Sequence, residues 1–172
     1  ILTSRNNLAG TQQEMGRLEE AITLYEKNLE DSERILGPHH PGTLTFRNNL
    51  AGAYQEAGRL HEAITLYEQI LADRTRILGP DHPDTLASLN NLANAYHAAG
   101  RLQDALELLN QNLINRLRFL GPDHLSTLAA RNYLASVLRD AGRLDKAIAL
   151  YEHNLENRIR ALGPDHPDTL AS

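Results

Sequence analysis

Four histidines recur along the chain at a fixed interval of 42 residues, each within a Leu-Gly-Pro-x-His sequence: His40, His82, His124 and His166. Imidazole nitrogens are common zinc ligands, so four of them could in principle form a metal site. In a stack of helices, however, equivalent residues of neighbouring repeats lie about 10 Å apart, whereas zinc needs its nitrogens about 2 Å from the metal. We therefore predict no metal site and expect each histidine to cap or pack within a loop.

Amide side chains form a second constellation with the same interval. They occur as the pairs Asn6-Asn7, Asn48-Asn49, Asn90-Asn91 and, with one replacement, Asn132-Tyr133. On a helical wheel with about 100° per residue, Asn90, Asn91 and Asn94 fall away from the apolar arc around Leu92. An amide offers two donors and an acceptor, so a row of them facing solvent could bond the backbone of an extended peptide. The predicted groove residues are Asn6, Asn7, Asn48, Asn49, Asn90, Asn91, Asn94, His97, Asn132, Tyr133 and Arg139.

Two residues of this surface suggest which side chains a ligand would have. Tyr133 interrupts the second row of amides and could offer an apolar pocket, and Arg139 adds a positive charge in the same repeat. We therefore expect an extended segment with an apolar or acidic residue near the fourth repeat. The alternative is a solvated surface that repeat duplication copied without any ligand.

Groups suited to catalysis are sparse. Glu19 and Glu20 are adjacent at an expected helix start, where their side chains diverge and complement the helix dipole. The chain contains no cysteine, no glycine-rich phosphate loop, no Gly-x-Ser-x-Gly and no His-Glu-x-x-His motif. We predict that the protein is not an enzyme and needs no cofactor.

The elements that position these side chains follow from the same interval. Gly-Arg-Leu begins at Gly16, Gly58, Gly100 and Gly142, and Leu-Gly-Pro begins at Leu36, Leu78, Leu120 and Leu162, without insertion. A fixed period of about 20 to 50 residues is the signature of a solenoid. We predict one solenoid over residues 1–172, with repeats at 1–42, 43–84, 85–126 and 127–168 and the start of a fifth. Both ends are cut within a repeat, which predicts a longer array.

Each repeat is expected to contain two helices, which in the third repeat span residues 85–98 and 102–120. Gly100 and the Gly121-Pro122 pair are predicted to end them. The predicted N-caps of the first helices are Gly42, Asp84, Ser126 and Asp168. The apolar pattern has the period of a helix, and it predicts a core that includes Leu50, Tyr54, Ala63, Leu71, Leu92, Tyr96, Ala105, Leu113, Leu134 and Leu155.

Composition narrows the classes of function. Hydrophobic residues make up 41% of the chain, and the net charge is −5 with a pI of about 5.9. That balance argues against nucleic-acid binding, which would need a basic stripe. No apolar run is long enough to cross a membrane, and the lack of cysteine fits a reducing cytoplasm, so we predict a cytoplasmic protein. Lysine occurs only at positions 27 and 146 among many arginines, a bias that hints at a GC-rich bacterial source.

Several residues have the spacing that is typical of the tetratricopeptide repeat family: Leu92, Ala93, Tyr96, Gly100, Leu102 and Ala105, with an aromatic residue at Tyr25, Tyr67 and Tyr151. The 42-residue length and the Asn-Asn-Leu-Ala and Leu-Gly-Pro-Asp-His-Pro motifs resemble the repeats of kinesin light chain and related bacterial regulatory arrays. This resemblance implies an all-α solenoid of antiparallel helix pairs in a right-handed superhelix. It also implies that the first helices line a concave groove for peptides or partner proteins.

The sequence departs from the family pattern in two ways. Leu109 replaces the aromatic residue in the third repeat. Arginine replaces a large apolar residue at Arg5, Arg47 and Arg131. We expect these arginines to lay their stems on the core and to pair with neighbouring acids.

We therefore expect a protein–protein interaction scaffold that binds an extended peptide or partner segment. Two other interpretations stay open. A structural spacer or self-associating array would need no groove ligand, and cut ends would expose Leu155, Ile159 and Leu162 to a neighbouring molecule. An RNA-binding helical repeat is less favoured, because the groove residues are mixed in charge and mildly acidic.

Overall fold

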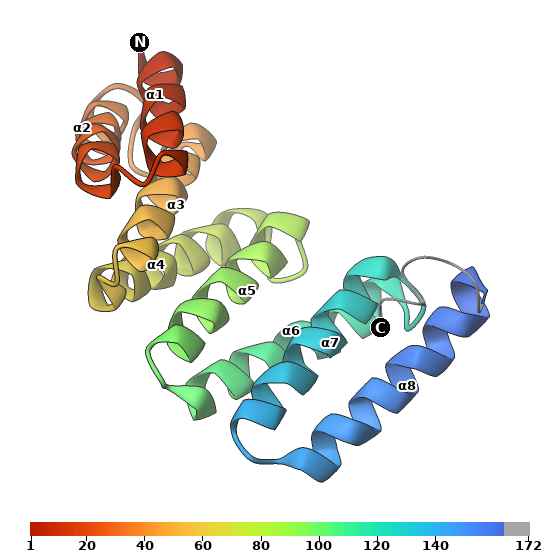
Figure 1. Ribbon diagram of the computed structural model, residues 1–172. Helices are drawn as coiled ribbons and strands as arrows, with labels where there is room; N and C mark the ends of the chain where they lie inside the picture. Colours follow the sequence, from red (N-terminus) through yellow and green to blue (C-terminus); the bar gives the residue numbers. More distant parts are fainter. Residues whose placement is uncertain (164–172) are drawn as a thin grey trace. The chain divides into compact units, whose positions relative to one another are not determined.

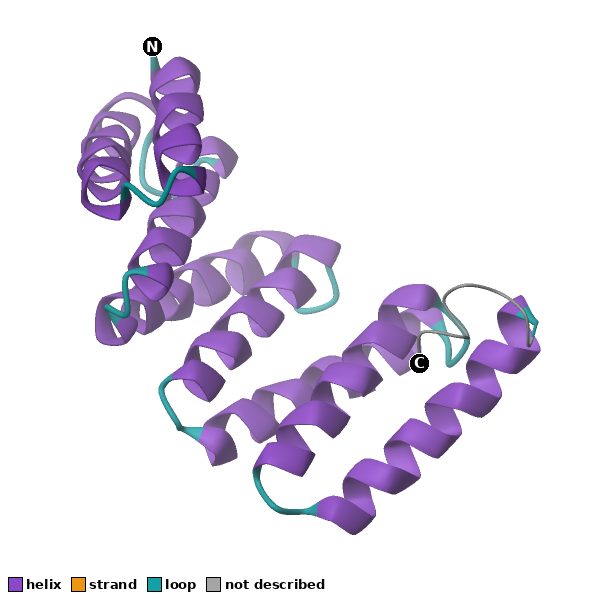
Figure 2. Ribbon diagram, in the orientation of Figure 1, coloured by secondary structure: helices purple, strands orange, loops and turns teal. Residues whose placement is uncertain are grey.

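The computed structural model describes residues 1–163, and all regular structure in that range is helical (Figure 2). The helices are α1 (Leu2–Glu14), α2 (Leu18–Leu36), α3 (Pro41–Glu56), α4 (Leu60–Leu78), α5 (Pro83–Ala98), α6 (Leu102–Leu120), α7 (Leu125–Asp140) and α8 (Leu144–Leu162). The all-α fold class is confirmed, and α5 and α6 match the two helices predicted for the third repeat. The predictions for His166, Asp168 and the start of a fifth repeat lie outside the described residues.

The chain forms two compact units, residues 1–77 and 78–172. In the first unit, α2 packs against both α1 and α3. In the second unit, α6 packs against α5 and α7, and α7 packs against α8 (Figure 1). Consecutive helices are therefore neighbours within each unit, as a solenoid of helix pairs requires. That all four repeats form one superhelical stack stays a prediction.

Three of the recurring histidines begin the first helix of a repeat. His40, His82 and His124 are the N-caps of α3, α5 and α7, and each Nδ1 accepts a hydrogen bond of 3.0–3.1 Å from a backbone N–H two residues later. This bond satisfies one of the amides that a helix start leaves unpaired. The expectation that these histidines are capping residues is confirmed. The predicted N-caps are wrong, because the residues at those positions donate to the histidines: Gly42, Asp84 and Ser126.

Replacing His124 with alanine is expected to destabilise the protein by about 1 kcal/mol, the usual cost of losing an N-cap acceptor. His124→Asp keeps an acceptor at the same position and should recover most of that loss. Urea unfolding followed by circular dichroism measures both variants. Equal losses for alanine and aspartate would contradict the capping role.

Glycines with positive φ follow both the first and the second helix of a repeat. Gly100 follows α5 with a φ of 73°, and Gly121 follows α6 with a φ of 83°. A residue without a Cβ adopts this left-handed conformation at little cost. The predicted helix ends are thereby confirmed.

Most of the predicted core is buried, and the exceptions reveal an error in helical phase. The buried members are Leu50, Tyr54, Ala63, Leu92, Tyr96, Ala105, Leu113 and Leu134. Leu71 is only half-buried, and Leu155 is 41% exposed. The position that is fully buried in every second helix lies one residue earlier, at Asn28, Ile70, Asn112 and Asn154. Asparagine is usually a surface residue. Treating the asparagines of this register as surface residues shifts the predicted core of the second helices by one residue.

Two of the arginines that replace apolar residues pair with acids, as predicted. Arg5 donates to Asp31 at 2.6 Å. Arg47 donates to Asp73 at 3.2 Å and to Glu33 at 2.7 Å. In both repeats the aspartate lies 26 residues after the arginine, so the pair joins the first helix of a repeat to its second.

The third of these arginines does not follow the pattern. Arg131 is buried, and the residue 26 positions later is Asn157 rather than an aspartate. Its guanidinium donates instead to Asn154 Oδ1 at 3.4 Å. The register of the aspartate thus carries an uncharged amide. Burial lowers the pKa of Arg131, and the negative charge of Asp123 in the loop before α7 opposes that shift.

Acidification is expected to destabilise the first unit more than the second. Hydrogen bonds from Arg5 and Arg34 lower the pKa of Asp31 from its ordinary value of 3.8. Burial raises the pKa of Asp73, but bonds from Arg76, His39 and Arg47 outweigh it and lower the pKa overall. A carboxylate with a lowered folded pKa stabilises the fold fully above its ordinary pKa, and that stability is lost as the pH falls through the lowered value.

Hydrogen exchange read by mass spectrometry at pH 5 and at pH 3 measures this effect helix by helix. We expect α2 and α4 to lose protection at the lower pH, while α6 and α8, which carry Asn115 and Asn157 at the aspartate register, keep most of theirs. A uniform loss along the chain would contradict this assignment.

Candidate binding surface

The first asparagine of each pair is half-buried, and in the second unit it bonds inward. Asn90 Oδ1 accepts a hydrogen bond of 2.6 Å from Asn112, which also donates to a backbone carbonyl of α5. Asn132 Oδ1 accepts in the same way from Asn154, which also donates to a backbone carbonyl of α7. In the second unit, the prediction that this row faces solvent is therefore wrong, because a buried asparagine 22 residues later donates to the amide oxygens of Asn90 and Asn132.

The same row is arranged differently in the first unit. Asn6 Oδ1 accepts a hydrogen bond of 2.8 Å from Asn49 on the neighbouring first helix. Asn28 occupies the register of Asn112 and is fully buried, yet neither of its amide atoms has a hydrogen-bond partner among the described residues. The second repeat carries Ile70 in this register, and Asn48 there is half-buried.

The second row is more accessible. Asn7 and Asn94 are exposed, while Asn49, Asn91 and Tyr133 are half-buried. The Tyr133 hydroxyl donates to Asn94 Oδ1 at 3.3 Å and so links α7 to α5. Burial raises the pKa of Tyr133 to about 12, so the phenol keeps its proton and remains a donor at neutral pH.

His97, Tyr133 and Arg139 form one polar cluster together with Asp140, which we call the α5–α7 cluster. His97 Nε2 lies 3.0 Å from Asp140 Oδ2, and its ring meets that of Tyr133 edge-on with centroids 6.4 Å apart. Arg139 Nε lies 3.3 Å from Asp140 Oδ1. Three of the predicted groove residues are therefore brought together, but part of the positive charge of Arg139 is offset by an acid.

The first unit has a related contact and a small hollow. Gln13 Nε2 donates to Glu56 Oε2 at 2.6 Å, at the register that His97 and Asp140 occupy in the second unit. Beside this contact lies a hollow of about 370 Å³ that is lined by Gly10, Gln13, Glu14, Tyr25 and Glu56. Burial, followed by the charges of Glu14 and Glu56, raises the pKa of Tyr25. The hollow is thus negative and polar, which suits an amide or a cationic side chain.

Metal chemistry has no candidate among the described residues. Within residues 1–163 we find no group of three or more histidines and acids that could hold a metal ion. In the same range, no helix has the length and apolar character needed to cross a membrane.

The buried asparagines that organise this surface were not predicted from the sequence. Asn112 and Asn154 each follow the first asparagine of a pair by 22 residues. The same spacing separates Asn28 from Asn6, so it occurs in three of the four repeats, and this recurrence was the available signal. Asp140 and Glu56 were also missed as partners, because pairing between repeats depends on the register of two helices and not on one helix.

Two models of the tetratricopeptide repeat family match the chain, one at residues 1–73 and 44–113 and the other at 127–168. The crystal structure of the nearly identical repeats of a Podosopora anserina protein designated a kinesin light chain is 35% identical. That match covers 99% of this chain and 81% of the other, with a TM-score of 0.88.

A second solved structure supports the fold alone. BtubC (BKLC) from P. vanneervenii is 22% identical, with a TM-score of 0.82, and the match covers 96% of this chain and 66% of the other. A search of curated proteins gives no match.

Proposed function

We propose that this chain, which belongs to the tetratricopeptide repeat family, binds an extended segment of another protein along the first helices of its repeats. Repeats of this family generally mediate protein–protein interactions and are typically scaffolds without enzymatic activity. Surface amides on the first helices carry the proposal, since they offer donors and acceptors to a peptide backbone. The exposed members are Asn7 in α1 and Asn94 in α5.

The preferred ligand differs between the two units. In the second unit, Tyr133 and His97 present aromatic rings next to Asn94, which suits an apolar ligand side chain, and Arg139 suits an acidic one. In the first unit, the carboxylates of Glu14 and Glu56 line the hollow and favour a cationic group. An extended chain rises about 3.3 Å per residue, so each repeat would meet about three ligand residues.

Replacing Asn7 and Asn94 together with alanine is expected to weaken peptide binding by about 1 kcal/mol for each lost hydrogen bond without unfolding the chain. Both side chains are exposed. Asn94→Ala removes the acceptor of the Tyr133 hydroxyl, but that bond is exposed, so water can replace it. Asn90 is unsuitable for this test, because its removal would leave the buried Asn112 side chain without one of its hydrogen-bond acceptors. Peptides selected from a random display library on the intact chain provide the ligand, and calorimetry measures affinity.

Gln69→Ala is the matched control, since Gln69 is an exposed amide on α4, a second helix. We expect its affinity to equal that of the unmodified chain. Unchanged affinity of the Asn7 and Asn94 variant, with the helical signal intact, would reject amide recognition and leave the duplicated surface as the better interpretation.

Self-association is a second candidate, and one observation favours it. Along α8 the apolar residues Leu144, Ile148, Leu155 and Ile159 are between 41% and 55% exposed. They are spaced four or seven residues apart, as one face of a helix requires. Contact through this face would join molecules end to end, and light scattering over a concentration series would detect it.

A further inference from the structure

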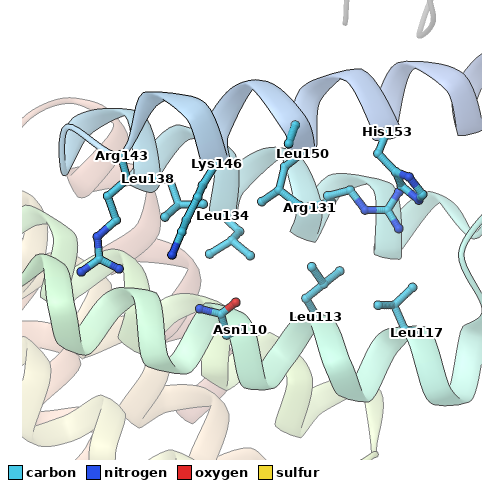
Figure 3. Close-up of a pocket in the computed structure, with 11 residues that line it drawn as sticks. Asn110, Leu113, Leu117, Arg131, Leu134, Leu138, Arg143, Lys146, Leu150 and His153 are labelled. Atoms are coloured by element: carbon cyan, nitrogen blue, oxygen red, sulfur yellow. The ribbon is translucent and has the colours of Figure 1, made fainter.

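A second surface, on the second helices, has the features of a ligand site. The second unit contains a pocket of about 610 Å³ between α6 and α8, with α7 at its floor (Figure 3). This volume lies within the usual range for ligand pockets. Its apolar lining is Leu113, Leu117, Leu134, Leu138, Ala149 and Leu150. None of the residues proposed to bind a peptide on the first helices lines it.

Basic side chains lie at both ends of this pocket. Arg143 and Lys146 lie at one end, and Arg131 and His153 lie at the other, with leucines between them (Figure 3). The lining residues, all of which are described, include no acid, although the chain as a whole carries a net charge of −5. The pocket is therefore apolar in the middle and positive at its ends.

The first unit provides a comparison, because equivalent residues lie 84 positions earlier, two repeats before. There, Arg59 lies 2.9 Å from Glu62 and stacks on Tyr54, with its guanidinium carbon 4.2 Å from the ring centroid. Tyr54 in turn donates to Glu26 at 2.6 Å. Arg47 bonds both Glu33 and Asp73, as described above. Each arginine at this place in the first unit thus has an acid beside it.

The second unit has other residues at the positions of these acids. Asn110 stands in the register of Glu26, Leu117 in that of Glu33, Lys146 in that of Glu62, and Asn157 in that of Asp73. Leu138 stands in the register of Tyr54, so Arg143 has no ring to cover. Five differences at the same place thus open the pocket and leave its arginines without the acids that neutralise them in the first unit.

Arg131 is the most deeply buried of the basic residues that line the pocket. Its side chain is buried, with 3% of the residue exposed, and its bond to Asn154 at 3.4 Å is to a neutral oxygen. A buried cation is costly unless an opposite charge compensates it. The charge of Asp123, which does not line the pocket, compensates Arg131 only in part, so a ligand carboxylate at this end of the pocket would add to that compensation.

We propose that this pocket binds an acidic segment of a partner protein in which apolar residues lie between carboxylates. The α6 side of the pocket runs from Asn110 to Leu117, about 10 Å at the rise of a helix, which matches about three residues of extended chain. Charges at both ends favour such a segment over a fatty acid, which carries one carboxylate at a single end. This inference is independent of the proposed function, because none of the residues that line the pocket belongs to the surface proposed to bind a peptide.

The test uses the peptide acetyl-Glu-Asp-Leu-Leu-Asp-Glu-amide with a fluorescent label, titrated with the intact chain and followed by anisotropy. Lys146→Glu restores the residue of the first unit and should pair with Arg143, so binding is expected to weaken about tenfold. Lys27→Glu makes the same change of charge at an exposed site in the first unit, and it should leave the affinity within about twofold. The amide analogue with glutamine and asparagine should bind about tenfold more weakly than the acidic peptide.

Arg131→Leu tests the other end of the pocket. The third repeat carries Leu89 in this register together with Asn115, so leucine beside Asn157 has a precedent within the chain, and circular dichroism verifies folding. We expect this variant also to bind the acidic peptide about tenfold more weakly. Absence of saturable binding to the unmodified chain would overturn the proposal. So would equal binding of the neutral analogue, equal binding by both pocket variants, or binding of oleate without binding of the peptide, which would indicate an acyl-chain site.

Discussion

Leu92→Ala is expected to lower the free energy of unfolding by about 2–5 kcal/mol. Leu92 is 3% exposed, and it lies on α5, which packs against α6. Alanine removes the transfer free energy of the buried atoms and leaves a cavity that close-packed neighbours fill only in part. Urea unfolding followed by circular dichroism measures the change.

Leu155→Ala is the matched control, because it makes the same substitution on a helix position that sequence analysis also placed in the core. Leu155 is 41% exposed, so its loss should cost less than about 1 kcal/mol. A similar cost at both positions would show that the two leucines are equally buried in solution, contrary to the packing described above.

Asn28→Ile is expected to stabilise the protein by about 1–3 kcal/mol, the usual penalty of a buried polar group without a partner. Asn28 is fully buried, and its Oδ1 and Nδ2 have no hydrogen-bond partner within the described part of the chain. Ile70, at the same register of the second repeat, is fully buried as well. The register therefore accepts isoleucine, and the substitution removes two unpaired polar atoms from the core.

The same substitution at Asn112 should have the opposite sign. Asn112 donates to Asn90 Oδ1 at 2.6 Å and accepts from Arg116 Nε at 3.0 Å. Isoleucine would leave both groups without this partner, at a cost of about 1–3 kcal/mol. Urea unfolding of the two variants side by side decides the matter, and a change of the same sign in both would contradict the hydrogen bonding assigned to this register.

The fold was largely predictable because its signals are local and repeated. Gly100 and Gly121 mark helix ends through their missing Cβ, and each does so again in the other repeats. The N-caps escaped prediction for a chemical reason. Serine and aspartate are the usual capping residues. Ser126 and Asp84 were therefore predicted as the N-caps instead of the histidines two positions before them.

The binding surface was less predictable, because it depends on contacts between helices. A wheel drawn for one helix places Asn90 opposite Leu92, but it contains no information about Asn112 on the next helix, which takes up the amide oxygen. Arg131 illustrates the same limit. It lacks the aspartate partner because residue 157, 26 positions later, is asparagine, and this difference becomes informative only beside the Arg47–Asp73 pair of another repeat.

The histidine caps and glycine stops carry a consequence for how such a chain can evolve. Every 42-residue period contains its own start signal and both of its stop signals. Gain or loss of one whole period in the gene separates no cap from the amide it bonds, whereas an insertion of another length within a helix shifts the register of its buried face. Length can therefore change by whole periods, while differences at single positions, such as asparagine rather than aspartate at positions 115 and 157, give some repeats a surface that the others lack.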